Sequence, residues 1–465
     1  MSDFRLLAER YATELTADLL AGRRRPGERL PTSRDYAHRQ GIAPSTASRV
    51  YAELVRRGVA VGEVGRGTFL RPPGDSAPGG PAGHGLPALP AREMRPDGIT
   101  DLEVNFCVLP EQAALLAPAL ARLAADPTAL TEAMLRAETR GTPASRAAAA
   151  ALLARGGWAP EPERLLFAGR GQQALAAVFS ALVPPGERIG FEAMTYTMAK
   201  GMALRLGLQP VPLAMDAEGL RPDALLAAHR AHPLRLVYLQ SELHNPLGTT
   251  MPPARRRELA ALLRELGIVA VEDAVYAFLA EDAGAPLAAL APEHVVLVDS
   301  LSKRVSPGLS LGFLVVPPAL RHRLAAALRL GGWTAPGYAL VACGTAWIEE
   351  GSVAELVRRK RQDAQARNAL ARQVLGEAGL SLRGDPRAYH LWLDLPGGWR
   401  AETFVAAAAR RRIAVSPAAE FAVGSGHAPD SVRLALAAPP AAALRPALEV
   451  LRDLALAGPE AGGVE

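Results

Sequence analysis

Apolar residues spaced four apart form a stripe near the start of the chain. The stripe predicts one amphipathic helix over residues 4–21, and its members are Leu7, Tyr11, Leu15 and Leu19. Beyond a Pro-Gly turn, Ser33 is a suitable N-cap for a second helix that ends near Gln40. Pro44 suits the first position of a third helix, because its missing N–H would have no partner there.

The third helix has two faces of different character. Its apolar face comprises Ala47, Val50, Tyr51 and Leu54, and its polar face comprises Ser45, Ser48 and Arg49. Two short strands, at about 59–62 and 67–70, follow it and are joined by a glycine-rich turn. Helices and a hairpin in this order predict a winged helix, in which the third helix can lie in the major groove of DNA.

Hydrophobic periodicity disappears between residues 72 and 98, where proline, glycine and alanine dominate. This composition is typical of a semi-stiff linker. The chain is therefore expected to comprise a DNA-binding head (1–71), a linker (72–98) and a body (99–465).

Helical and strand patterns alternate along the body. Helices are expected near 111–125, 144–155, 171–182, 221–231, 252–266 and 317–330. Short apolar runs that end in polar residues lie at 187–192, 234–240, 267–273 and 294–300. Such runs fit parallel strands that helices cover on both faces, so the expected fold class of the body is α/β with a doubly wound sheet.

Polar residues follow three of these strands, at the edge of the sheet where ligands bind in such folds. They are Asn245, Asp273, Tyr276 and Lys303. A lysine of near-neutral pKa can form a Schiff base with an aldehyde cofactor. A carboxylate facing a pyridine nitrogen keeps that nitrogen protonated, and an amide and a phenol can hold the ring oxygen. This combination indicates pyridoxal 5′-phosphate (PLP) as the cofactor.

The charge of the chain is concentrated in the head. The net charge is +5, and residues 1–71 hold thirteen arginines and eight acids, which accounts for the whole surplus. A basic head on a neutral body favours an anionic partner of the head. Lysines occur at positions 200, 303 and 360 and nowhere else, so lysine chemistry has few possible locations.

Length and composition limit the class of protein. A chain of 465 residues is too long for one compact domain, and its 49% apolar content is ordinary for a globular protein. Two cysteines are too few for a disulfide framework or a cysteine-rich metal site. The first residues are charged, and no apolar run is long enough to span a membrane. We therefore expect a cytoplasmic protein without a membrane segment or a metal.

The head resembles the GntR-type winged helix. The matching motifs are LP-x-SR, G-I-x-x-S-T, Y-x-x-L-x-x-x-G and G-x-G-T-F, all within residues 27–70. The resemblance implies DNA contacts from Arg34, Ser45, Thr46, Arg49 and Arg66. Where the family often has an arginine before the position of Ser45, this chain has Pro44. The alternative is that these arginines form only a solvated face.

The body resembles fold-type I, aspartate-aminotransferase-like enzymes, which implies PLP and a small C-terminal α+β subdomain. Lys303 would form the Schiff base, Asp273 would pair with the pyridine nitrogen, and Asn245 and Tyr276 would bind the ring oxygen. The resemblance assigns the phosphate to Gly171, Gln172, Gln173, Ser300 and Ser302. Tyr196 would stack on the ring, and Arg433 would bind the substrate carboxylate.

Each of these residues alone also has an ordinary structural explanation, such as a strand-end cap or a solvated side chain. Five motifs in family order favour the cofactor site. One departure is that Ser310 stands where the family usually has a phosphate-binding arginine. Arg304, next to Lys303, is one candidate to compensate.

Head, linker and body together resemble the MocR subfamily of GntR regulators. The resemblance implies a transcription factor whose body binds PLP and senses an amino compound. It also implies a homodimer in which the head of one subunit lies against the body of the other. Two alternatives stay open: a working aminotransferase with an accessory DNA-binding head, and a DNA-binding protein whose body no longer uses PLP.

Overall fold

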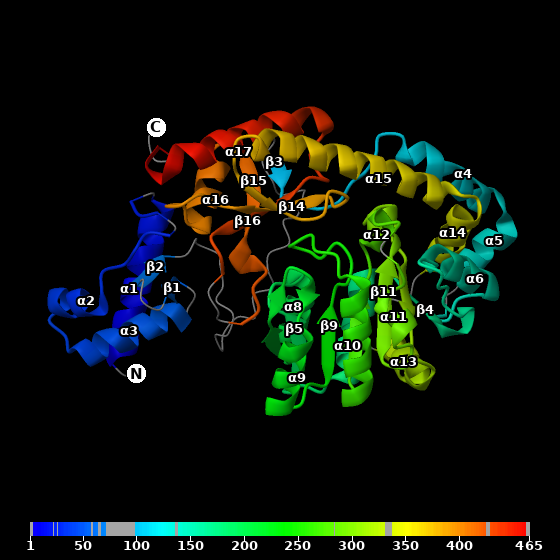
Figure 1. Ribbon diagram of the computed structural model, residues 1–465, viewed down its shortest axis with the longest axis horizontal. Coiled ribbons are helices and arrows are strands. Elements are labelled where there is room, and N and C mark those ends of the chain that lie inside the picture. Colours follow the sequence, from blue (N-terminus) through cyan, green and yellow to red (C-terminus); the bar gives the residue numbers. More distant parts are fainter. Residues whose placement is uncertain are drawn as a thin grey trace.

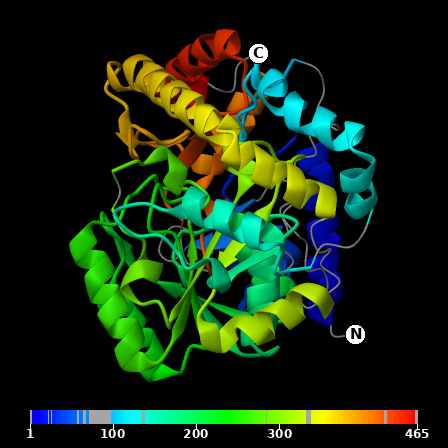
Figure 2. The ribbon, with the colours of Figure 1, turned by 90° about the vertical axis from the view of Figure 1, so that its right-hand side faces the viewer.

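The computed structural model describes most of the head and body (Figures 1 and 2). The described residues are 3–21, 23–25, 27–56, 59–63, 67–70, 98–134, 138–282, 284–330, 337–424 and 428–461. Arg66 and residues 72–97 of the expected linker lie outside them. Among the described residues, no helix has the length and apolar character needed to cross a membrane.

The head has the helices and the hairpin that its sequence predicts. Its elements are α1 (Asp3–Leu20), α2 (Ser33–Gln40), α3 (Pro44–Arg56), β1 (Ala60–Glu63) and β2 (Gly67–Leu70), and the two strands pair antiparallel. The expected apolar face of α3 is buried in the core of the head. This core also contains the stacked rings of Tyr11 and Tyr36, whose centres lie 4.5 Å apart. The N-cap of α2 is Thr32 and not Ser33, because the Thr32 hydroxyl accepts the N–H of Asp35.

A seven-stranded sheet lies at the centre of the large domain of the body. In spatial order the described strands are β4 (Leu165–Ala168), β12 (Gly312–Val315), β11 (Val295–Ser300), β10 (Val269–Asp273), β9 (Leu236–Leu239), β5 (Arg188–Glu192) and β6 (Gln209–Leu213). Strand β12 is antiparallel to both of its neighbours, and the other neighbouring strands are parallel. The expected mostly parallel sheet is thereby confirmed.

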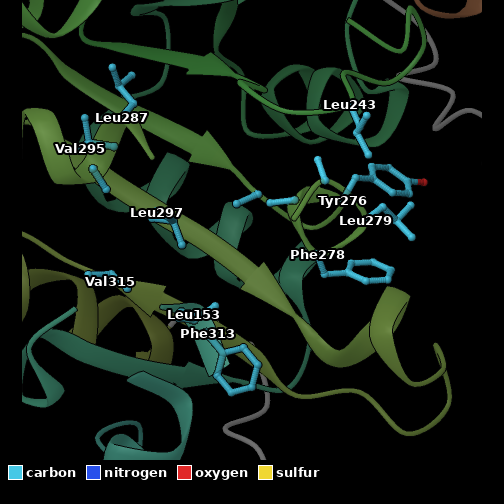
Figure 3. Close-up of a cluster of buried hydrophobic side chains, with 14 of the residues drawn as sticks. Leu153, Leu243, Tyr276, Phe278, Leu279, Leu287, Val295, Leu297, Phe313 and Val315 are labelled. Carbon is cyan, nitrogen blue, oxygen red and sulfur yellow. The ribbon is translucent and has the colours of Figure 1, made fainter. Parts of the chain in front are cut away.

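Helices cover both faces of this sheet. One face carries α7 (Gly171–Leu182), α8 (Thr197–Arg205) and α13 (Arg321–Leu330), and the other carries α6 (Pro143–Leu153), α9 (Pro222–Ala231), α10 (Pro253–Leu266) and α11 (Leu287–Leu290). Alternate residues of β11 therefore enter different cores: Val296 packs with α7, whereas Val295 and Leu297 pack with α10 and α11 (Figure 3). Burial on both faces explains the continuous apolar runs in the sequence.

Helices occur at all the expected positions in the body, with ends shifted by a few residues. The range 317–330 divides into a 3₁₀ turn (Pro318–Leu320) followed by α13. The remaining helices of the large domain and its connection are α4 (Gln112–Ala125), α5 (Pro127–Ala133), α12 (Leu301–Arg304), α14 (Tyr338–Glu349) and α15 (Ser352–Ala371). Short strands β7 (Met215–Asp216) and β8 (Gly219–Leu220) form a separate hairpin.

A second, smaller sheet forms the C-terminal α+β domain. Its described strands are, in order, β13 (Ser381–Arg383), β14 (His390–Asp394), β16 (Ser431–Ala435), β15 (Ile413–Pro417) and β3 (Thr100–Leu102). Helices α16 (Ala401–Arg410) and α17 (Ala441–Ala461) pack with it. Strand β3 comes from the start of the body and pairs in parallel with β15, so this domain combines two distant chain segments.

The head contacts the small domain at α16 (Figure 1). The Arg400 guanidinium lies 3.9 Å from the centre of the Phe69 ring, which belongs to the hairpin of the winged helix. Gly27 approaches Thr403 so closely that an added Cβ would lie 2.8 Å from its methyl group. The DNA-binding fold is therefore in direct contact with the body.

Gly312 is expected to be indispensable for the turn that leads into α7. A Cβ at this position would lie 2.7 Å from the carbonyl carbon of Arg170. We predict that Gly312→Ala lowers the free energy of unfolding of the body by about 1–3 kcal/mol, because the backbone of Arg170 cannot move away from the added Cβ without distorting the turn. Gly308→Ala is the matched control, since no atom lies within 4 Å of its added Cβ. Equal denaturation midpoints for the two variants would contradict this account.

Candidate functional site

Three neighbouring parallel strands end at one edge of the large sheet and deliver the expected polar residues there. Asp273 is the last residue of β10, Asn245 follows β9, and Lys303 lies on α12 directly after β11. Tyr276 lies three residues beyond Asp273, at the end of an apolar cluster (Figure 3). Parallel pairing therefore brings together residues that are far apart in sequence.

Lys303 has the environment of a reactive amine. Its Nζ donates a hydrogen bond to the backbone oxygen of Asn105 at 2.8 Å and lies 3.5 Å from the centre of the Phe106 ring. Burial, helped by the positive charge of Arg433, lowers the pKa of Lys303 to about 7. A large fraction of this lysine is therefore neutral, and nucleophilic, at neutral pH.

The other two lysines bind backbone carbonyls. Lys360 is fully buried and donates to the carbonyl oxygens of Cys107, Lys303 and Val305 at 2.7–3.0 Å. Lys200 donates to the carbonyl oxygens of Glu420 and Ala422. Lys303 donates to a single carbonyl oxygen and is influenced by the charges of Arg433 and Asp273, so it is the lysine best placed for covalent chemistry.

Asp273 is a buried carboxylate with neutral hydrogen-bond donors. The Tyr238 hydroxyl donates to its Oδ2 at 2.7 Å, and the Val275 N–H donates to its Oδ1 at 3.3 Å. Burial raises the pKa of Asp273 to about 6. A cationic group placed beside it would favour the charged form, as a protonated pyridine nitrogen would.

Arg433, on β16, is a buried guanidinium that donates hydrogen bonds to neutral groups of the described chain. It donates to Oδ1 of Asn245 at 2.9 Å, to the backbone oxygen of Glu103 and to the Ser416 hydroxyl. Its Nε has no partner in the described part of the chain. Burial lowers the pKa of Arg433. Such a cation is suited to an incoming carboxylate.

The N-terminus of α7 lies against the hydroxyl groups that follow β11. An added Cβ on Gly171 would lie 3.3 Å from Oγ of Ser300, which itself lies 2.5 Å from Oγ of Ser302. Gln172 donates to the Tyr196 hydroxyl at 3.0 Å, which places Tyr196 beside this helix end. Backbone N–H groups at a helix start and clustered hydroxyls are donors suited to a phosphate.

Several buried polar atoms in this region have no partner among the described residues. They include Oδ1 of Asn105, Oε1 of Gln173 and Oγ of Ser310. Buried polar atoms are normally hydrogen-bonded, so these atoms fit a site completed by a polar ligand. Together with Lys303, Asp273 and Arg433, they fit a molecule with an aldehyde, a ring nitrogen and a phosphate.

The sequence suggested Arg304 as a replacement for the phosphate-binding arginine that is absent at position 310, but Arg304 has another role. Its buried guanidinium pairs with Asp299 and lies 5.2 Å from the centre of the Phe278 ring. Arg304 is therefore engaged by an acid of the preceding strand.

Sequence reasoning missed the segment that follows β3. Asn105 donates through its Nδ2 to the Tyr276 hydroxyl at 3.0 Å, and the same nitrogen lies 3.3 Å from Nδ1 of His390. His390 Nε2 lies 2.9 Å from the backbone oxygen of His244, and burial lowers the pKa of His390 to about 3. The neutral ring therefore donates from Nε2 and accepts at Nδ1. No motif surrounds Asn105, and only the pairing of β3 with β15 brings it here.

The candidate DNA contacts lie on α2 and α3. Arg34, Ser45 and Arg49 are exposed, and Thr46 is half-buried. Pro44 begins α3, as expected. Arg66, the expected contact at the tip of the hairpin, lies outside the described residues.

Family models match both parts of the chain. Residues 97–451 match the model "Aminotransferase class I and II", and residues 7–70 match "Bacterial regulatory proteins, gntR family". Among curated relatives, the HTH-type transcriptional regulator YdeF of Bacillus subtilis is 29% identical over 439 residues, which is 92% of this chain and 89% of the relative. The regulator TauR of Rhodobacter capsulatus is 27% identical over 438 residues, which is 84% of each chain.

Enzymes are also among the relatives. The 2-aminoadipate transaminase of Thermus thermophilus is 30% identical over 288 residues, which is 59% of this chain and 71% of the enzyme. The crystal structure of LysN, the α-aminoadipate aminotransferase of Thermus thermophilus, complexed with N-(5′-phosphopyridoxyl)-L-leucine, has a TM-score of 0.69 and 25% identity over 78% of this chain and 93% of LysN.

These matches confirm the expected fold, the regulator class and the cofactor class. The chain belongs to the aminotransferase class I and II family, whose cofactor is PLP, and its GntR-type head makes it a transcriptional regulator of the MocR subfamily.

Proposed function

We propose that this protein is a PLP-dependent DNA-binding regulator whose body holds PLP at Lys303 and senses an amino compound. One observation carries the proposal: a buried lysine of near-neutral pKa shares a site with Asp273 and Arg433, in a chain whose head is a winged helix. When bound, PLP supplies a carbonyl carbon that reacts with amines. The residues around it bind and orient the cofactor and the effector.

Each residue of the site has a distinct proposed role. Lys303 provides the neutral amine, and Asp273 holds the proton on the pyridine nitrogen. Asn245 and Tyr276 bind the ring oxygen, and Tyr196 stacks on the ring. The phosphate is bound by the start of α7 and the adjacent hydroxyls, namely Gly171, Gln172, Gln173, Ser300 and Ser302.

The effector is proposed to carry a carboxylate as well as an amine. Arg433 is a buried cation whose described hydrogen-bond partners are neutral, and its planar guanidinium can bind a carboxylate in a bidentate manner. An amino acid or a related amino acid-like compound meets both requirements.

A continuous set of contacts links this site to the head. Lys303 and Arg433 donate to the backbone oxygens of Asn105 and Glu103, which directly follow β3. Strand β3 pairs with β15, β15 packs against α16, and Arg400, the N-cap residue of α16, contacts the head. A ligand that takes Lys303 or Arg433 away from this segment can therefore favour one head–body arrangement and change DNA affinity.

The protein is further proposed to act as a homodimer. Large apolar side chains are exposed on and around α4 and α5, and they are Val108, Leu120, Leu130 and Met134. An exposed apolar surface of this kind suits contact with a second copy of the chain. With exchanged heads, the contact of Phe69 with Arg400 would form between subunits and not within one.

A catalytically active aminotransferase is the second candidate. The same Lys303, Asp273 and Arg433 could serve turnover, and one relative is a transaminase. Half-transamination with a panel of amino acids separates the candidates: conversion of bound PLP by several amino acids at enzyme-like rates would favour the enzyme.

The first test concerns the amine. Since burial lowers the pKa of Lys303 to about 7, the rate of PLP attachment should rise through neutral pH and level off by about pH 8, whereas an ordinary lysine titrates near pH 10. Attachment is followed by absorbance and located by borohydride reduction and peptide mapping. Arg433→Gln should move the midpoint upward, because the charge of Arg433 lowers this pKa, and Lys200→Arg should leave it unchanged. Failure of borohydride to fix PLP at Lys303 would refute the proposal.

A second test concerns DNA. In gel shifts on the protein's own upstream region, Arg34→Gln and Arg49→Gln should each weaken binding and reduce the slope of log affinity against log salt by about 1, as loss of one phosphate contact does. Arg257→Gln, an exposed arginine of α10, is the control of equal charge change. PLP should alter the shift, and a shift that does not respond to PLP would contradict the sensor role.

The third test addresses the link between site and head. Arg400→Ala should leave the absorbance of bound PLP unchanged but reduce the effect of PLP on DNA affinity by about two- to tenfold, because a cation–π contact contributes about 0.5–1 kcal/mol or more. Arg400→Lys, which keeps a cation at this position, should retain most of the effect. Full coupling in Arg400→Ala would show that the contact with Phe69 does not transmit the signal.

A further inference from the structure

The phosphate end of the proposed site lacks its expected cation. Ser310 replaces the arginine, and Arg304 is paired with Asp299. The remaining groups assigned to the phosphate are a helix N-terminus, amides and hydroxyls, all formally neutral. A phosphate monoester carries about −1.5 to −2 charge at pH 7, whereas a helix N-terminus offers only about +0.5. A nearby cation is therefore needed to complete the charge balance.

Strand pairing locates the turn that lies next to Ser310 at the start of β12. Strands β12 and β4 are antiparallel, with Gly312 opposite Ala168 and Phe313 opposite Phe167. The pairing ends at Gly312 and Ala168. The chain then turns across the start of β12, so that the backbone of Arg170 lies against Gly312, two residues after Ser310.

Close backbone contacts show that the two segments stay together beyond the last paired residues. An added Cβ on Gly312 would lie 2.8 Å from the backbone oxygen of Arg170 and 3.1 Å from the backbone nitrogen of Gly171. On its other side, Gly312 pairs with Ser300 of β11. Arg170 thus directly precedes the N–H groups of α7 and lies beside the hydroxyls assigned to the phosphate.

The side chains of Arg170 and Ser310 are both without partners in the described chain. Arg170 is the N-cap residue of α7 with extended backbone, and its exposed side chain has no hydrogen bond or ion pair with any described residue. The Ser310 side chain is 4% exposed, and its Oγ has no hydrogen-bond partner. A buried hydroxyl without a partner indicates that a polar ligand completes its surroundings.

We propose that Arg170 supplies the cation for the cofactor phosphate, in place of the arginine that is absent at position 310. The cation would then come from the turn before α7 and not from the start of β12. This inference rests on the proposed function, because it concerns the same cofactor. It makes Arg170 a cofactor-binding residue that discriminates phosphorylated from unphosphorylated pyridoxal compounds. Because Arg170 is exposed, its contribution should weaken with rising salt.

The experiment measures binding of pyridoxine 5′-phosphate and of pyridoxine, which lack the aldehyde and cannot attach to Lys303. In the full-length protein, Arg170→Gln is expected to weaken binding of the phosphate ester at least tenfold and to leave pyridoxine binding unchanged. Arg170→Lys should lie between wild type and Arg170→Gln. Arg205→Gln, an exposed arginine at the end of α8, is the matched control and should behave as wild type.

A double variant tests whether a cation at position 310 can replace the one at position 170. The double variant Arg170→Gln/Ser310→Arg should recover most of the affinity for the phosphate ester, because position 310 faces the same site. Equal affinity of Arg170→Gln and wild type for pyridoxine 5′-phosphate would overturn the inference, and so would an equal loss for both ligands. Failure of wild type to attach PLP at Lys303 would instead refute the proposed function, so the two failures are distinguishable.

Discussion

The parallel pairing of β9, β10 and β11 is the constraint on which the site depends. Three strands that run in the same direction end at the same edge of the sheet, so the residues that follow them must converge. The pairing is fixed because alternate residues enter cores on opposite faces, and a shift of one position would exchange the two sets. The position of Lys303 relative to Asp273 is therefore set by the packing of the whole domain.

Because of this constraint, ionisable groups are buried in surroundings that disfavour their charged forms. Lys303, Asp273 and Arg433 are buried. Burial lowers the pKa of Lys303 and Arg433 and raises that of Asp273, which in each case favours the neutral form. Buried charges cost free energy unless they are paired. A cofactor with an aldehyde and a ring nitrogen, together with an effector carboxylate, would offer each of these groups a partner, so their binding should stabilise the folded body through mass action.

The periodic parts of the fold could be predicted from the sequence. The helices of the head, its hairpin and four strands of the large sheet (β5, β9, β10 and β11) carry clear hydrophobic patterns, and Asn245, Asp273 and Lys303 lie at or soon after strand ends. The cap at Thr32 was missed by one residue, because two adjacent hydroxyl residues both suit an N-cap and only the bond to Asp35 distinguishes them.

Other features depend on tertiary contacts that leave no local pattern. Asn105 reaches the site through the pairing of β3 with β15, and Arg304 is turned toward Asp299 by burial. Arg170 is equally inconspicuous in the sequence, because only the contact of the turn before α7 with Gly312 brings it near Ser310. Motifs were therefore sufficient to locate the site, whereas the residues that contact its members could be identified only from the folded structure.

The pairing of β3 with β15 has a consequence for the order of events during synthesis. The winged helix is built from contacts within residues 3–70 and can form soon after these residues leave the ribosome. Residues 100–102, in contrast, must wait for residues 413–415, which are made near the end of the chain. The head can thus be folded well before the body is complete, and control of DNA binding by a ligand is acquired only by the finished polypeptide.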